Sequence, residues 1–150
     1  MLCRHYMVRS AVALTTVPDT VTLGTALAKM IKHHTQQLLL IDEAGEFKGE
    51  ISTFTLAKML LPADAGGPQS REQAELETLG DVDDRITPHL GRRVSDFAEH
   101  DLPIVEPDTP LSDALRLMVP GRLRLPVVDP KTKQLVGVIS PLTVLRRYQF

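Results

Sequence analysis

Apolar residues recur along the chain with helical spacing in two separate places. In each place they occupy positions i, i+3, i+4 and i+7, which form one face of an amphipathic helix. The first set is Leu23, Ala26, Leu27 and Met30. The second set, at an offset of 88 residues, is Leu111, Ala114, Leu115 and Met118. The pattern therefore predicts two equivalent helices, each with its apolar face toward a core.

The duplication continues on both sides of these helices. At the same offset of 88 residues, Gly49, Ile51, Ser52 and Thr55 recur as Gly137, Ile139, Ser140 and Thr143. Pro18-Asp19-Thr20 recurs as Pro107-Asp108-Thr109 at an offset of 89 residues, and Asp42 recurs as Asp129 at 87. Length changes this small fall in loops, where they are tolerated. Two copies with so long a period indicate a duplicated unit rather than a solenoid.

In the second copy, local signals predict the order strand, helix, strand, strand, helix. Short apolar runs bounded by turn residues predict strands at Leu102–Val105, Leu125–Val128 and Leu135–Ser140. The first helix is expected to begin at Pro110, behind Thr109 as its N-cap. It should end near Val119, because Pro120 cannot continue a helix. The last helix is expected at Pro141–Tyr148, capped by Ser140.

The first copy predicts the same elements and completes the fold class. They are the helix Leu23–His34, the strands Leu38–Ile41 and Phe47–Ser52 around a turn at Gly45, and the helix Thr53–Leu61. We therefore predict an α/β (α+β) fold of two β-α-β-β-α repeats, related by a pseudo-twofold axis and packed sheet to sheet. The predicted organisation is repeat 1 at residues 1–61, a linker at 62–93 and repeat 2 at 94–150.

The linker is polar and is expected to hold one short helix between stretches of mobile loop. Ser70–Gln73 matches the capping-box pattern at the start of a helix. Gly80 is a candidate for the end of that helix, because glycine is common just past a helix C-terminus.

Composition limits the classes of function. The net charge is −2, and the chain has no Trp and only 4% aromatic residues. These values argue against a basic nucleic-acid-binding surface and against an aromatic platform for bases. Cys3 is the only cysteine, so no disulfide can form within the chain. No apolar run is long enough to cross a bilayer. We therefore expect a cytoplasmic protein that binds neither nucleic acid nor membrane.

The two copies resemble the cystathionine-β-synthase-type (CBS) domain, whose tandem pair is called a Bateman module. In the second copy the matching pieces are Val105–Leu111, Arg124–Asp129 and Gly137–Ser140. In the first copy they are Val17–Thr20, Leu39–Asp42 and Gly49–Ser52. The resemblance covers nearly the whole chain except the linker, and it depends on the order and spacing of these motifs.

The resemblance implies a sensor that binds AMP, ADP, ATP or another adenosine-containing ligand in the clefts between the repeats. The implied ligand-binding residues are Thr20, Ser52, Thr55, Thr109, Arg124, Pro126, Ser140 and Thr143. Arg124 is the expected phosphate ligand, since a guanidinium group recognises phosphate bidentately. The chain departs from the family where Thr55 and Thr143 replace an aspartate that holds ribose. It also has Gln37 at the place of Arg124 in the first copy.

Each of these residues has a simpler interpretation. Ser52 and Ser140 can serve only as helix caps, and Arg124 can be a solvated or ion-paired surface residue. His33 and His34 do not predict a metal site, because adjacent helical residues face different ways. Arg146 suits the negative end of the last helix dipole.

We expect no catalysis, no metal and no required cofactor, because the chain lacks a nucleophile elbow, a phosphate-cradling glycine loop and a metalloprotease helix. The predicted function is a regulatory module that binds a nucleotide and acts on a protein partner. The alternative is a ligand-free module for structural dimerisation or partner docking. In either case a homodimer is expected, with apolar surface near the C-terminus at Leu142, Leu145, Tyr148 and Phe150.

Overall fold

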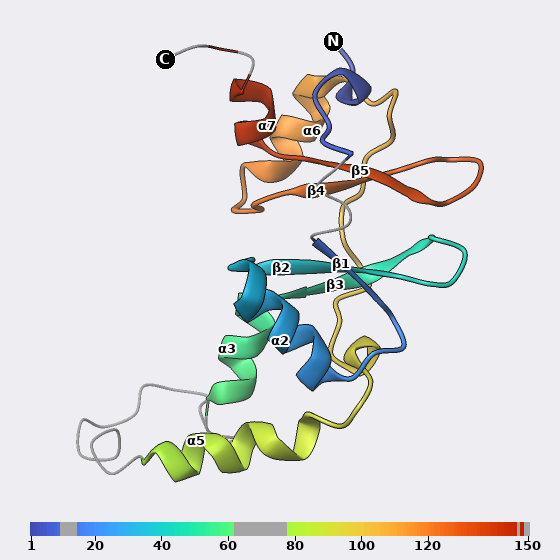
Figure 1. Cartoon of the computed structure of the whole chain (residues 1–150). Helices are drawn as coiled ribbons and strands as arrows, with labels where there is room; N and C mark the ends of the chain where they lie inside the picture. Colours follow the sequence, from blue (N-terminus) through green and yellow to red (C-terminus); the bar gives the residue numbers. More distant parts are fainter. Residues whose placement is uncertain (10–14, 62–77, 147, 149–150) are drawn as a thin grey trace.

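The computed structural model describes residues 1–9, 15–61, 78–146 and 148. Two halves lie one above the other, each with a small sheet facing the other half and helices on the outside (Figure 1). The first half contains the strands β1 (Thr16–Pro18), β2 (Gln37–Ile41) and β3 (Phe47–Ser52). Strand β2 lies in the middle, parallel to β1 and antiparallel to β3. The helices of this half are α2 (Leu23–His33) and α3 (Thr53–Leu60).

The second half repeats this arrangement with one strand fewer. It contains the antiparallel strands β4 (Leu125–Val128) and β5 (Leu135–Ile139), and the helices α6 (Leu111–Met118) and α7 (Pro141–Leu145). The predicted strand Leu102–Val105 is wrong, because only Val105 pairs, in a single parallel bridge with Val127. Pro103 has no N–H to donate, which prevents a continuous ladder there.

Two predicted helix ends in this half also need correction. Thr109 does not cap α6: its Oγ1 accepts a hydrogen bond from the Glu106 N–H at 2.9 Å, and Pro110 occupies the N-cap position. The Thr109 hydroxyl thus stabilises the turn that precedes α6 and does not cap the first turn of the helix. Helix α7 ends at Leu145 rather than at Tyr148. The predicted cap at Ser140 is confirmed, with the Thr143 N–H donating to Ser140 Oγ at 3.3 Å.

The described part of the linker contains helix α5 (Leu79–Ile86), which contacts α3 (Figure 1). The predicted start at Ser70–Gln73 lies outside the described residues. Gly80 does not end a helix, because it falls in the first turn of α5. The start is fixed by Thr78 and Asp81, which exchange side-chain-to-backbone hydrogen bonds of 2.8 and 3.3 Å in a capping box. The domain boundaries at residues 61 and 94 stay a prediction.

The helical stripes bury the faces that their spacing predicts. Leu23, Ala26 and Met30 lie in the core of the first half, and Leu111, Ala114 and Met118 in that of the second. A third cluster, formed by Leu39, Val128, Leu135 and Val138, lies between the two sheets. Burial of one leucine side chain contributes about 1.5–3 kcal/mol, so this third cluster holds the two halves together.

Each half is completed by a segment from elsewhere in the chain, a feature that the sequence analysis did not predict. The short 3₁₀ helix η1 (Cys3–His5) packs into the core of the second half, where the Cys3 N–H donates to the Thr109 carbonyl at 2.9 Å. The 3₁₀ helix η3 (Val94–Asp96) packs into the first half, where the Val94 N–H donates to the Val21 carbonyl at 2.9 Å. We call residues 1–8 and 94–100 the crossing segments.

The crossing segments explain why a glycine recurs at the offset of 88 residues. A Cβ added to Gly49 would lie 2.7 Å from the carbonyl oxygen of Glu99, and Gly49 has a φ of +143°. A Cβ added to Gly137 would lie 3.0 Å from the sulfur of Met7. The passage of a crossing segment therefore leaves no room for a side chain at Gly49, and at Gly137 a side chain would require the Met7 side chain to shift.

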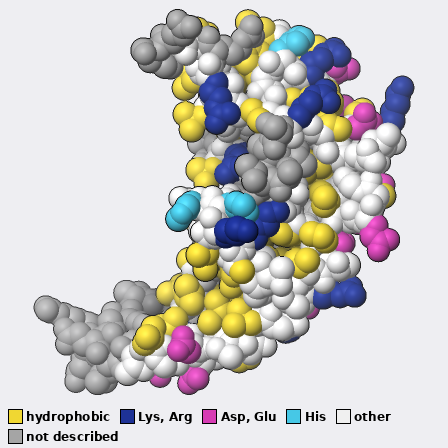
Figure 2. Space-filling model, viewed as in Figure 1, with side chains coloured by type: hydrophobic (Ala, Val, Ile, Leu, Met, Phe, Trp, Pro, Cys, Tyr) yellow, Lys and Arg dark blue, Asp and Glu magenta, His cyan; other side chains and the backbone are white. Residues whose placement is uncertain are grey.

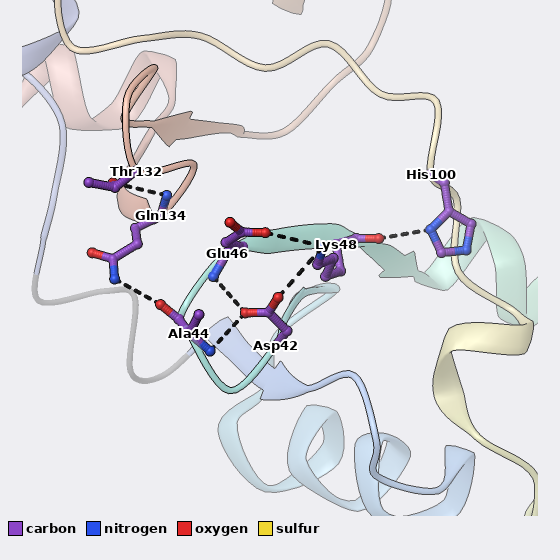
Figure 3. Close-up of polar contacts among 7 residues, drawn as sticks. All are labelled: Asp42, Ala44, Glu46, Lys48, His100, Thr132 and Gln134. Carbon is purple, nitrogen blue, oxygen red and sulfur yellow. Dashed lines mark hydrogen bonds and ion pairs between the residues drawn. The ribbon is translucent and has the colours of Figure 1, made fainter.

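Polar contacts tie the ends of the two hairpins and one crossing segment together (Figure 3). Gln134 Nε2 donates to the carbonyl of Ala44 at 2.8 Å, which joins the two hairpin turns. The Asp42 carboxylate accepts the N–H groups of Ala44 and Glu46, both at 2.9 Å, and so shapes the first turn. On β3, the His100 ring contacts the Lys48 carbonyl at 2.8 Å through Nδ1 (Figure 3).

Candidate functional site: two clefts between the halves

Two clefts open where the helix starts of one half meet the other half. Both include Gln36 and Leu123 in their walls. The first, which we call the Arg124 cleft, has a volume of about 430 Å³. Its walls are formed by Val8, His34, Gln36, Leu123, Arg124, Val138, Ser140, Leu142, Thr143 and Arg146. On the face drawn in Figure 2, basic and histidine side chains gather between the upper and lower halves.

The second cleft, which we call the Glu50 cleft, has a volume of about 310 Å³. Its walls are formed by Gln36, Gln37, Glu50, Ser52, Thr53, Phe54, Glu99, Pro120, Gly121, Arg122 and Leu123. The two clefts correspond through the repeat: Ser52 takes the place of Ser140, Gln37 that of Arg124, and Glu50 that of Val138. The fold thus builds two equivalent cavities with different chemistry.

Arg124 is the main charged group of its cleft. Its guanidinium is half-buried, and this burial lowers its pKa while the nearby charge of Glu50 opposes the shift. Among the described residues its side chain has one hydrogen-bond partner, Thr35 Oγ1 at 3.4 Å. Most of the guanidinium donors therefore remain available to a ligand, and the interpretation of Arg124 as a fully solvated residue does not fit.

Ser140 and Thr143 lie at the start of α7, but their hydroxyl groups already take part in the cap. Thr143 Oγ1 donates to the Ser140 carbonyl at 2.8 Å and accepts from the Ser140 N–H at 3.0 Å. It can therefore accept at most one further hydrogen bond. Ser140 Oγ accepts from Thr143 and still has its own proton to donate.

The predicted ligand-binding residues are only partly brought together. Arg124, Ser140 and Thr143 share one cleft, and Ser52 lies in the other. The remaining four, Thr20, Thr55, Thr109 and Pro126, do not line either cleft as the structure describes it. Pro126 is fully buried in β4, and its carbonyl accepts the Val105 N–H at 3.0 Å.

Several residues of the clefts were missed by the sequence analysis. All three of the most informative ones come from the first half, opposite Arg124. His34 and Gln36 lie between α2 and β2, and Glu50 lies in β3. Glu50 carried a signal in the sequence, because it stands where the repeat places the apolar Val138. A carboxylate at a buried position of a strand is unusual and indicates a functional or strained position.

Glu50 is only 8% exposed, although it is ionisable. Burial raises the pKa of its carboxyl group, while a hydrogen bond from the Gln37 side chain and the charges of Arg122 and Arg124 lower it. The exposed carboxylate of Glu99 adds to the upward shift. The net direction is upward, so burial is the dominant influence on this group.

The described residues show no group of three or more His, Cys, Asp or Glu side chains that could hold a metal ion. Cys3 is fully buried, and both its burial and the charge of Asp113 raise the pKa of its thiol, which disfavours a nucleophilic thiolate. No helix in the described part of the chain is long and apolar enough to cross a membrane.

The duplicated motifs, the paired sheets and the two clefts agree with a comparison against protein families. The model of the CBS domain matches the chain twice, at residues 3–61 and 94–149. The chain belongs to the CBS domain family. The predicted resemblance to a tandem CBS pair and the predicted α+β fold are therefore confirmed.

Several solved structures have the same fold. CBSX2 from Arabidopsis thaliana is 24% identical, with a TM-score of 0.73 over 97% of this chain and 92% of the other. CBSX2 in complex with AMP is 23% identical, with a TM-score of 0.69 over 97% and 94%. CbpB in complex with c-di-AMP is 12% identical, with a TM-score of 0.69 over 98% and 83%. A search of curated proteins gives no match.

Proposed function

We propose that this CBS pair is a non-catalytic regulatory module that binds AMP, ADP, ATP or a related adenosine nucleotide in the Arg124 cleft. The observation that carries the proposal is the half-buried guanidinium of Arg124, most of whose donors have no partner among the described residues. A partly desolvated cation with open donors is a strong site for phosphate, because charge-assisted hydrogen bonds are stronger than neutral ones.

Other groups in the cleft suit the same ligand. Arg146 and His34 add basic side chains to its walls, and Ser140 offers a hydroxyl proton to a phosphate oxygen. Two solved structures with the same fold, of CBSX2 and CbpB, are complexes with AMP and c-di-AMP. In this proposal the protein is cytoplasmic and needs no cofactor, and the nucleotide changes how the module fits a regulated partner.

The test compares Arg124→Ala with the wild type by isothermal titration calorimetry. AMP and ADP should bind more weakly to the variant by about 1.5–3 kcal/mol, the range for hydrogen bonds to charged groups. Adenosine has no phosphate and should lose little. Arg116→Ala is the matched control, because Arg116 is exposed on α6 and its one ion pair within the described part of the chain is with Asp113 at 3.2 Å. Equal losses for AMP and adenosine would contradict a phosphate role for Arg124.

A second candidate function is ligand-free dimerisation or partner docking, supported by exposed apolar side chains on the outer helices. Ile31, Phe54 and Leu142 are 75%, 67% and 71% exposed. Figure 2 shows hydrophobic side chains gathered over the lower half, where α2 and α3 lie. We propose a homodimer with an isologous interface. Light scattering should give the dimer mass at tens of micromolar, a concentration well above the roughly 1 μM dissociation constant of a weak dimer. A monomer mass there would overturn this proposal.

A further inference from the structure

The Glu50 cleft has the opposite chemistry to the Arg124 cleft. Where the repeat places Arg124 and Val138 in one cleft, it places Gln37 and Glu50 in the other. Glu99 also lines the Glu50 cleft. A phosphate there would face two carboxylates, Glu50 and Glu99, against one arginine, Arg122, among the described wall residues, and like charges repel. The second cleft is therefore unsuited to the ligand that the first one favours.

An unpartnered acceptor indicates what the Glu50 cleft lacks. Gln37 is 5% exposed, and its Oε1 has no hydrogen-bond partner among the described residues. A buried acceptor left in this state costs about 1–3 kcal/mol. The Gln37 side chain also makes a hydrogen bond to the Glu50 carboxylate, so the two groups lie side by side. One donor group placed against both would satisfy the amide and neutralise the acid.

No cation of the described residues already fills this role. Arg122 and Arg124 act on Glu50 through their charges, but neither forms an ion pair with it within the described part of the chain. Ser52, also in the wall, occupies the N-cap position of α3 without capping the helix. Its hydroxyl differs in this respect from that of Ser140, and it adds an acceptor for a donating ligand.

We propose that the Glu50 cleft binds a small organic cation through a primary ammonium or amidinium group. The Glu50 carboxylate, Gln37 Oε1 and Ser52 Oγ accept its hydrogen bonds. The volume of about 310 Å³ admits a molecule the size of a diamine or an amino acid. Arg122 in the wall distinguishes a diamine from an amino acid, because only the amino acid has a carboxylate with which Arg122 can pair. This site is distinct from the nucleotide site, although the two clefts share Gln36 and Leu123.

The test is calorimetric titration with putrescine and with arginine. The wild type should bind at least one of them, and Glu50→Gln should bind it at least about tenfold more weakly, since tenfold equals about 1.4 kcal/mol. Glu46→Gln is the matched control: Glu46 precedes β3, pairs with Lys48 at 3.2 Å and lines neither cleft. Arg122→Ala should weaken the binding of arginine, whose carboxylate loses its partner, whereas putrescine, which has no carboxylate, should bind no more weakly than to the wild type.

A measurement on the wild type covers the case in which Glu50→Gln does not fold. Acidification protonates Glu50, whose pKa is raised by burial, so cation binding should weaken as the pH falls from neutrality. The other charged groups that act on Glu50 are Glu99, Arg122 and Arg124. The proposal is overturned if neither probe binds the wild type, if Glu50→Gln binds as tightly as the wild type, or if binding strengthens on acidification. Each outcome can be read independently of AMP binding in the Arg124 cleft.

Discussion

Replacement of Gly49 by alanine tests whether the crossing segments are part of the folded core. Gly49 lies in β3 with a φ of +143°, directly beneath the second crossing segment. The new Cβ would lie 2.7 Å from the Glu99 carbonyl oxygen, which is closer than real Cβ atoms come to any neighbour. That oxygen accepts the Glu50 N–H at 2.9 Å, and the Glu99 N–H donates back to Glu50 at 2.8 Å. The methyl group can be accommodated only if this pair of hydrogen bonds opens.

The cost has two parts. A left-handed backbone conformation costs a residue with a side chain about 1–2 kcal/mol. Loss of the two hydrogen bonds adds about 0.5–1.5 kcal/mol each. The free energy of unfolding of Gly49→Ala should therefore fall by about 2–5 kcal/mol. Gly121 supplies a matched control, because its φ is +113° but nothing lies within 4 Å of a Cβ added there. Gly121→Ala should lower the free energy of unfolding only by the backbone cost, about 1–2 kcal/mol.

Urea denaturation followed by circular dichroism gives both values from the shift of the midpoint at an unchanged slope. The two variants should differ by about 1–3 kcal/mol, the contribution of the two hydrogen bonds. Equal losses for Gly49→Ala and Gly121→Ala would mean that the segment around Glu99 does not pack on β3. The crossed arrangement of the first half would then be refuted.

Three further predictions concern single side chains. His100→Ala should lower the free energy of unfolding by about 0.5–1.5 kcal/mol in a urea titration, because the ring contacts the carbonyls of Lys48 and Ser95 at 2.8 and 3.2 Å. Thr143→Asp should keep the helix start and tighten adenosine binding by about 1–3 kcal/mol in calorimetry, with no such gain for 2′,3′-dideoxyadenosine, which lacks both ribose hydroxyls. Hydrogen bonds from the backbone N–H groups of Thr132 and Lys131 lower the pKa of Asp129 below its ordinary value of 3.8. The ionised Asp129 carboxylate therefore stabilises the fold above pH 3.8, and this stabilisation is lost as the pH falls through the lowered pKa. Asp129→Asn should thus be less stable than the wild type near neutral pH, and the difference should shrink in titrations below pH 3.8.

Much of the fold was predictable because its signals are local. The spacing of Leu23, Ala26 and Met30 repeats every turn of a helix, and all three are buried in α2. The runs Phe47–Ser52 and Leu125–Val128 have the bounds of β3 and β4. The crossing segments could not be predicted in the same way, because Cys3 and Val94 belong to stretches too short and irregular to show a period.

The candidate site was predictable only on one of its walls. Arg124 and Ser140 belong to motifs within one repeat, and the resemblance of these motifs to the CBS domain predicted that they share a site. His34 and Gln36 join them only because the two sheets stack, and no local pattern encodes that contact. Glu50 interrupts the repeat with a charge, and the duplicated sequence therefore contained a signal for the second cleft.

The crossing segments have a consequence for the order of folding. The strand-like end of the first segment, at Val8, pairs with Val138 in β5, and Leu2 pairs with Pro110. The first crossing segment is synthesised long before these partners. Cys3 and Tyr6 therefore remain exposed to solvent until the second half, whose core they join, has formed. Contacts this distant in sequence slow folding and leave apolar surface exposed to aggregation for longer. Strand β5 must therefore form before the first crossing segment can be buried.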